Sequence, residues 1–171
     1  RYIITDLKRF RIIRGDDTLG GMVICETSEQ ARRLFAYFDE IQNELNKDAS
    51  SKSHFKVGLI LYDSDDKDTR ENVITDFKDN FKVDMLIVYN MLLTGFDAPR
   101  LKRLYFGRKL RDHNLLQAIT RVNRPYKNNR YGYIIDFADI KKNFDETNAA
   151  YLAELNKFND PDEVGEGNEA N

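Results

Sequence analysis

Five short apolar runs are spread along the chain and are separated by segments that are richer in polar residues. The runs have the length and the content of β-branched and aromatic residues that strands require. We expect strands at Met22–Cys25, Phe55–Tyr62, Asp84–Tyr89, Arg103–Phe106 and Tyr131–Phe137. The third run is almost continuously apolar, which is typical of a strand that is buried on both faces of a sheet.

The segments between the runs carry apolar residues at helical spacing. After the first run, Thr27 and Gln30 form a T-x-x-Q capping box in front of a long stripe of this kind. Helices are also expected around Val73–Phe77, from Asp112 through Ile119, and at Ile140–Leu155, and the pattern at Tyr2–Ile13 is amphipathic. Strands that alternate with helices predict an α/β fold of three layers, in which helices cover both faces of a parallel sheet.

This pattern divides the chain into four parts. Residues 1–19 are expected to form a helical connecting segment and residues 20–139 the α/β domain. Residues 140–158 are expected to form a helix that either completes this domain or begins another. Residues 159–171 are acidic and nearly free of apolar residues, so a disordered tail is expected there. Both ends suggest a piece of a larger protein, and Gly20-Gly21 is interpreted as a turn before the first strand.

Composition narrows the possible classes of protein. Hydrophobic residues make up 41% and charged residues 33% of the chain, which suits one ordinary globular core. No apolar run approaches the ~20 residues that a membrane-spanning helix needs. The single cysteine, Cys25, and two histidines cannot supply a zinc site of the usual spacing, so no metal site is expected. We expect a buried, reduced thiol in a cytoplasmic protein. The net charge of −2 means that any contact with DNA must be local.

Several catalytic signatures are absent from the sequence. It contains no G-x-x-x-x-G-K-[ST] loop and no G-x-G-x-x-G loop, so the chain has no phosphate-binding loop of its own. There is also no evident nucleophile with an adjacent base. An independent nucleotide-hydrolysing enzyme is therefore not expected.

Two segments nevertheless have unusual composition. Leu86–Pro99, LIVYNMLLTGFDAP, ends a strand with Gly-x-Asp-x-Pro. In QAITRVNR, Gln117, Arg121 and Arg124 stand at i, i+4 and i+7, which is one stripe of a helix if the helix extends that far before Pro125. The planar fork of arginine binds phosphate oxygens well. Taken singly, the first segment is also compatible with an ordinary turn and the second with a solvated helix face.

Together and in this order, the two segments resemble motifs V and VI of superfamily 2 helicases and translocases. The strand and capped helix at Met22–Phe38 resemble motif IV of the same superfamily. The longer run MLLTGFDAPRLKRLYFGRKLRDHNLLQAITRVNRP, Met91–Pro125, resembles the R (HsdR) subunit of type I restriction enzymes. The resemblance covers roughly residues 20–140. It implies a RecA-like second motor domain, which resembles P-loop NTPases but lacks its own P-loop.

The resemblance also implies a nucleotide site. In this superfamily ATP and Mg²⁺ lie between two RecA-like domains, and the upstream domain supplies the P-loop and the Mg²⁺-binding acidic residues. Arg124 would then be the arginine finger on the γ-phosphate, and Arg121 a second phosphate or interdomain contact. Gln117 would position the phosphate end. Gly95 would allow close approach of the backbone, and Asp97 would contact the ribose or link motif V to motif VI.

For nucleic acid, the resemblance implies contacts with the phosphate backbone of a duplex and no reading of its sequence. Candidate contacts are the helix N-terminus at Thr27 and Ser28, with Asn90 and Thr94; Thr27 and Ser28 also suit a simple cap. Two positions depart from many relatives, since Thr120 replaces glycine and Tyr89-Asn90 replace threonine. A cluster of basic residues is expected to line a groove or to form a solvated edge: Arg100, Lys102, Arg103, Arg108, Lys109 and Arg111.

The function implied by the resemblance is ATP-driven translocation of double-stranded DNA, coupled to cleavage by a nuclease domain elsewhere in the parent protein. The implied partners are the upstream RecA-like and nuclease domains and the methylation and specificity subunits. The isolated piece is expected to be inactive. Two alternatives remain open: domain 2 of another superfamily 2 motor, and a non-catalytic α/β binding platform.

Overall fold

The computed structural model describes residues 1–46, 55–61, 66–89, 96–108 and 112–138, and the single positions 145, 149 and 153. Within these residues, helices and strands alternate as the sequence pattern predicts. The helices are α1 (Tyr2–Arg14), α2 (Ser28–Asn46), α3 (Lys67–Lys78) and α4 (Asp112–Val122). The strands are β1 (Gly20–Ile24), β2 (Val57–Ile60), β3 (Met85–Val88), β4 (Leu101–Phe106) and β5 (Tyr133–Asp136).

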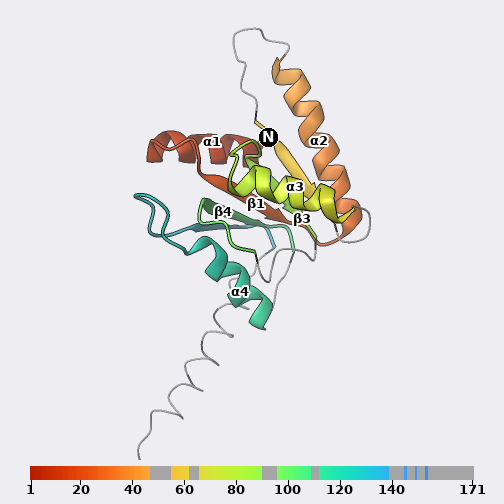
Figure 1. Cartoon of the computed structure of the whole chain (residues 1–171). Coiled ribbons are helices and arrows are strands. Elements are labelled where there is room, and N and C mark those ends of the chain that lie inside the picture. Colours follow the sequence, from red (N-terminus) through yellow and green to blue (C-terminus); the bar gives the residue numbers. More distant parts are fainter. Residues whose placement is uncertain are drawn as a thin grey trace, which may run out of the picture.

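The five strands form one parallel sheet in the order β2-β3-β1-β4-β5. β1 lies in the centre, hydrogen-bonded to β3 on one side and to β4 on the other, and all its residues are buried. Figure 1 shows the strands crossing the molecule between the helices. The predicted three-layer α/β fold with a parallel sheet is confirmed.

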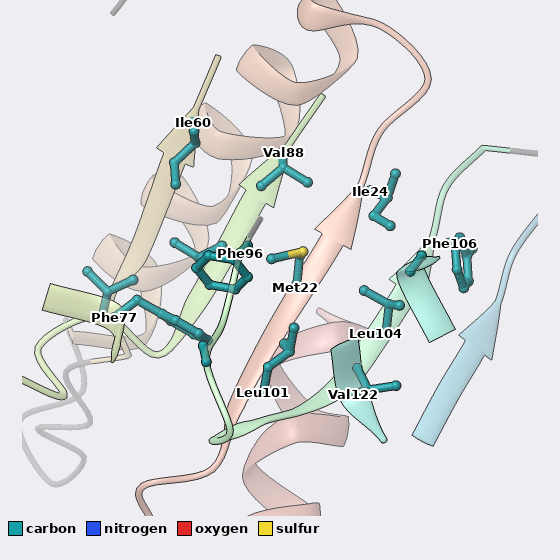
Figure 2. Close-up of a cluster of buried hydrophobic side chains, with 14 of the residues drawn as sticks. Met22, Ile24, Ile60, Phe77, Val88, Phe96, Leu101, Leu104, Phe106 and Val122 are labelled. Atoms are coloured by element: carbon teal, nitrogen blue, oxygen red, sulfur yellow. The ribbon is translucent and has the colours of Figure 1, made fainter. Parts of the chain in front are cut away.

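Side chains from alternate strand positions fill two hydrophobic cores, one on each face of the sheet. The core that contacts α3 and α4 contains Met22, Ile24, Val88, Leu104 and Phe106 from the strands and Phe77, Leu115 and Val122 from the helices; most of these are labelled in Figure 2. The core that contacts α1 and α2 contains Val23, Met85, Ile87 and Tyr105 from the strands. This period of two follows from the pleat, which turns successive side chains to opposite faces.

α1 packs directly against the sheet. Its buried apolar residues are Ile4, Leu7 and Phe10. Its Arg11 side chain donates to the carbonyl of Leu19 at 2.7 Å and forms an ion pair with Asp84 at 2.6 Å. Asp84 stands immediately before β3, so this pair fixes the helix to the start of an interior strand. The segment expected to be a connector thus contributes to the same core, while the boundary at residue 20 stays a prediction.

The interpretation of Gly20-Gly21 as a turn is wrong. Both glycines are strand residues at the start of β1, and both are buried. A Cβ atom on Gly20 would lie 2.5 Å from Cζ of Phe77. The glycine is therefore explained by the close approach of α3 to the central strand and not by a turn conformation.

Among the described residues, β5 is one of the two edge strands of the sheet and lies next to β4. It is shorter than the apolar run that predicted it, and most of its side chains are exposed, including Tyr133 at 38% and Ile134 at 36%. Apolar sequence alone does not distinguish an edge strand from a central one. The helix predicted at Ile140–Leu155 and the acidic tail lie outside the described residues, apart from the single positions 145, 149 and 153.

Candidate functional site

α4 carries two of the three residues that the sequence places on one stripe. Gln117 and Arg121 lie on the helix one turn apart, but α4 ends at Val122, so Arg124 follows the helix. The stripe was expected to include Arg124 only if the helix extended that far, and it consists of Gln117 and Arg121. The cause is local. The ring of Pro125 disfavours a helical conformation of the residue before it, which is Arg124.

Arg124 forms an ion pair with Asp97, so the two sequence motifs meet at this point. Both side chains are partly exposed, at 41% for Arg124 and 56% for Asp97. An exposed pair of this kind contributes only about 0–1 kcal/mol to stability. The link between the two motifs through Asp97 was one of the two roles inferred for that residue. Because the pair is weak, the guanidinium can exchange this carboxylate for another anion.

Arg121 is held differently. Its Nη1 donates to the backbone carbonyl of Phe96 at 3.0 Å, which ties α4 to the segment before β4. Its Nε is buried and has no hydrogen-bond partner among the residues that the structure describes. The hydroxyl of Thr120, the preceding residue, donates to the carbonyl of Gln117 within the same helix at 2.8 Å. The Arg121–Phe96 hydrogen bond and the Arg124–Asp97 ion pair are therefore two links between the end of α4 and the residues that precede β4.

Asp97, Arg121 and Arg124 lie near the amino-terminal ends of the parallel strands. Asp97 precedes the first residue of β4, Leu101, which pairs with Gly20, the first residue of β1. Thr27 and Ser28 follow the carboxyl end of β1. Five strand residues separate the two places, or about 16 Å of strand. The structure thus brings Arg121, Arg124 and Asp97 together, and it leaves Thr27 and Ser28 at the opposite, carboxyl-terminal ends of the strands.

The start of α2 shows a helix cap. The Thr27 hydroxyl accepts a hydrogen bond from the Gln30 N–H at 3.0 Å, as the capping box predicts. The Gln30 side chain accepts from the N–H of Glu26 at 2.6 Å, one residue earlier than the motif places it. A cavity of about 480 Å³ lies beside this turn, lined by Thr27, Glu29, Gln30, Arg33, Leu34 and Tyr37. A contact of Thr27 or Ser28 with DNA stays a prediction. Asn90, Thr94 and Gly95 lie outside the described residues.

Among the basic residues around β4, Arg100 and Lys102 do not line a groove, while Lys109 and Arg111 lie outside the described residues. Arg100 and Lys102 are 1% and 0% exposed, so both expectations for the cluster, a groove and a solvated edge, are wrong for them. Arg100 lies 4.7 Å from the ring centroid of Phe77 and donates to backbone carbonyls, those of Thr18, Phe77 and Val83. Burial lowers the pKa of Arg100 to about 10, so it stays charged at neutral pH. Arg103 pairs with Asp6 at 3.2 Å.

The sequence analysis did not predict that these cations are buried, because the residue type alone does not distinguish a buried arginine or lysine from a solvated one. The available signal was position: Arg100 and Lys102 directly precede and enter an apolar strand. Cys25, by contrast, is buried as predicted, and burial raises the pKa of its thiol to about 11. Among the described residues, no group of three or more metal-ligating side chains is present, and no helix is long and apolar enough to cross a membrane.

Comparison with known families gives a match over most of this domain. The sequence profile of the family described as Type I restriction enzyme subunit R domain 3 matches residues 27–139. The match includes α2, α4 and the segment between β3 and β4, and therefore all the site residues described above. α1 and β1, which complete the core, precede it.

Two similar proteins carry related names. A protein of Methanocaldococcus jannaschii named as a type I restriction enzyme MjaVIIP endonuclease subunit is 37% identical over 124 residues, which are 72% of this chain and 10% of that protein. The type I restriction enzyme SauCOLORF180P endonuclease subunit of Staphylococcus aureus strain COL is 31% identical over 153 residues, which cover 80% of this chain and 16% of that protein. The chain thus spans a small part of these relatives.

Solved structures of helicase domains share the fold. Mss116p DEAD-box helicase domain 2, solved bound to an RNA duplex, aligns with a TM-score of 0.55 and 15% identity, covering 80% of this chain and 48% of that one. The C-terminal domain of the DEAD-box protein Dbp5 aligns with a TM-score of 0.53 and 19% identity, covering 88% of this chain and 78% of that one. At such identities the likeness concerns the fold alone, which is RecA-like.

Proposed function

Because the chain belongs to the domain 3 family of type I restriction enzyme R subunits, we propose that it is the part of an ATP-driven motor that completes the nucleotide site and moves double-stranded DNA. In this proposal, translocation is coupled to endonucleolytic cleavage by another domain of the same protein. The relatives named as endonuclease subunits, which are much longer than this chain, support that division of labour.

The observation that carries the proposal is that the Arg124 side chain is partly exposed and weakly paired. Its guanidinium is 41% exposed, lies beyond the end of α4, and is held by one weak surface ion pair. A phosphate group with a larger negative charge than a carboxylate competes well for such a guanidinium, because the fork geometry of arginine matches phosphate oxygens. These residues therefore fit the γ-phosphate of ATP at an interdomain cleft.

Within this site we assign the roles as follows. Arg124 donates hydrogen bonds to the phosphoryl oxygens as negative charge develops on them, which is the action of an arginine finger. Asp97 receives the guanidinium again when no phosphate competes for it. Arg121 keeps α4 attached to the segment at Phe96, and Gln117, one turn earlier, positions the phosphate end. Gly95 gives the backbone of this segment room for close approach.

The remaining catalytic parts must come from outside the chain. The sequence has no P-loop, and its described residues hold no cluster of metal ligands. We therefore assign ATP binding and the Mg²⁺ ligands chiefly to an upstream RecA-like domain. The isolated chain is expected to hydrolyse no ATP.

The proposed partners follow from the same assignment. Duplex DNA would be held through its phosphates, and the candidate contacts are Thr27 and Ser28 at the carboxyl-terminal end of β1, together with Asn90 and Thr94. Methylation and specificity subunits would supply recognition of the DNA sequence. The carboxyl-terminal ends of the strands, near Thr27, would then face DNA. The amino-terminal ends, near Arg124, would face ATP.

The proposal is tested by Arg124→Ala in the complete R subunit, with Arg130→Ala as the matched control. Arg130 is an exposed arginine in the same connection between α4 and β5. We expect Arg124→Ala to lower kcat for DNA-stimulated ATP hydrolysis by about 10³-fold or more, with unchanged duplex affinity, and Arg130→Ala to leave both unchanged. An Arg124→Ala protein that still hydrolyses ATP normally contradicts the finger role. A complete wild-type subunit that binds its partners but hydrolyses no ATP would favour the non-catalytic platform instead.

A further inference from the structure

Lys102 is a buried cation that contacts the end of α4. It is the second residue of β4 and is 0% exposed. Its ammonium group donates to the backbone carbonyl of Val122 at 3.3 Å and to that of Arg124. These two carbonyls stand at the last residue of α4 and at the candidate arginine finger. Lys102 therefore holds the backbone from which the Arg124 side chain extends.

The alternation of side chains along β4 explains how a strand residue reaches this helix. Leu104 and Phe106 point to the face of the sheet that α4 covers, and Lys102, two residues before Leu104, points to the same face. β4 pairs with β1 so that Leu101 pairs with Gly20 and Arg103 with Gly21, and the register shifts between these two pairs. This irregularity brings Leu101 to the same face as Lys102. Arg103, the next residue, contacts Asp6 of α1 on one face, while Lys102 contacts α4 on the other.

The contact suits the chemistry of a helix end. The last carbonyls of a helix have no partner within it and carry the negative end of the helix dipole, so a positive donor there is favourable. An ammonium group has three N–H donors, enough for both carbonyls. Burial lowers the pKa of the Lys102 ammonium group. The hydrogen bonds to the carbonyls of Val122 and Arg124 oppose this effect, because they stabilise the charged form. The charge is thus placed where the backbone itself compensates it.

We propose that Lys102 is a positioning residue for the arginine finger. It touches no substrate and acts through the backbone of residues 122–124, so that the Arg124 guanidinium is presented at one fixed place. This inference rests on the proposed function of Arg124. The alternative is that Lys102 serves only the stability of the fold, as any well-bonded buried cation does.

Arg100 gives a matched control for that alternative. It stands two residues before Lys102, is equally buried, and also donates to backbone carbonyls. Its acceptors are in the α1–β1 connection and around the end of α3, at Thr18, Phe77 and Val83. None of these acceptors belongs to α4. Replacing either cation by methionine removes a buried donor, but only the change at Lys102 releases the end of α4.

The experiment compares Lys102→Met, Arg100→Met, Arg124→Ala and the double variant Lys102→Met with Arg124→Ala in the complete R subunit, at a temperature where each is folded. We expect Lys102→Met to lower kcat for DNA-stimulated ATP hydrolysis by about 10- to 100-fold, since a displacement near 1 Å costs about that much. The KM for ATP and the duplex affinity should stay unchanged. Arg100→Met should keep the wild-type kcat. The double variant should be no slower than Arg124→Ala alone, because Lys102 acts only through Arg124.

Hydrogen exchange gives a readout that does not depend on activity. Amides in the last turn of α4 should exchange faster in Lys102→Met and normally in Arg100→Met. If Lys102→Met does not fold, Lys102→Gln, which keeps N–H donors without the charge, takes its place and should lose less kcat than Arg124→Ala.

Three results would overturn the inference. They are a wild-type kcat in the folded Lys102 variant, an equal loss of kcat in Arg100→Met, and a double variant that is slower than Arg124→Ala. If Arg124→Ala itself is fully active, the proposed function fails first, and this outcome is distinct from the other three.

Discussion

Gly132 sets how closely the end of α4 can approach the start of β5. A Cβ atom at this position would lie 2.3 Å from the carbonyl oxygen of Val122 and 2.7 Å from its carbonyl carbon. These are backbone atoms, which cannot swing aside as the tip of a long side chain can. An ordinary contact between carbon and oxygen is at least about 3.3 Å. In a Gly132→Ala variant, the end of α4 must therefore move by about 1 Å.

Two opposing effects set the change in stability of this variant. Alanine restricts the unfolded chain more than glycine, which stabilises the folded state by about 0.4–1 kcal/mol where the backbone conformation is allowed. Overpacking against fixed atoms costs about 1–3 kcal/mol. The steric cost is larger, so Gly132→Ala should be less stable by about 1–2 kcal/mol. The same 1 Å displacement, acting on Arg124, should lower kcat about 100-fold.

The assays are urea unfolding of the 171-residue chain and DNA-stimulated ATP hydrolysis by the complete R subunit. Gly21→Ala is the matched control. Its Cβ would lie 3.1 Å from Cε of Met85, 3.2 Å from Cδ2 of Leu7 and 3.4 Å from Cε2 of Tyr105, which are all side-chain atoms. It should destabilise the chain less than Gly132→Ala, because these side chains can shift by a few tenths of an ångström, and it should leave kcat unchanged. If Gly132→Ala is as stable and as active as Gly21→Ala, the close contact between residue 132 and α4 does not exist and the reasoning fails.

Two further predictions concern other parts of the chain. Gly20→Ala should destabilise the chain by about 1–3 kcal/mol, because its Cβ would lie 2.5 Å from the buried ring of Phe77; urea unfolding that shows no difference from Gly21→Ala would contradict this. Asp16 gives a pH dependence. Burial acts to raise its pKa, but hydrogen bonds from Thr18 and Lys127 outweigh burial and hold the pKa below 3.8. Its stabilising effect is therefore complete above the unfolded pKa and is lost as pH falls through the folded pKa. Asp16→Asn should be less stable at neutral pH and lose less stability below about pH 4, as measured by the urea midpoint against pH; parallel curves for the two proteins would exclude the role of Asp16.

Apolar patterning was sufficient to predict the strands, because it reports burial directly. The runs at 22–25 and 84–89 correspond to β1 and β3, the two most buried strands. The pattern was less informative at β5, whose apolar residues remain exposed at the edge of the sheet. The order β2-β3-β1-β4-β5 could not be read from the pattern, since pairing depends on contacts between residues far apart in sequence.

The candidate site was predictable in its membership and not in its geometry. The two sequence motifs identified Asp97, Arg121 and Arg124, and Pro125 was recognised as a residue that stops the helix. Helical periodicity did not show whether Arg124 still belongs to the helix, which ends at Val122. The position of Lys102 in an apolar strand was a weak signal of its burial, since a lysine next to arginines also suggests a solvated surface. Its contacts with the carbonyls of Val122 and Arg124 could not be predicted, because they join residues that the fold alone brings together.

The position of α1 has a consequence for how this chain can be divided into fragments. The family profile begins at residue 27, but the sheet that it describes is covered on one face by a helix from residues 2–14. A fragment cut at the profile boundary would lack the central strand β1, and one cut at residue 20 would expose the apolar surface under Leu7 and Phe10. It would also leave Asp84 without the guanidinium of Arg11. The segment that the family profile matches is therefore shorter than the segment that forms the hydrophobic cores.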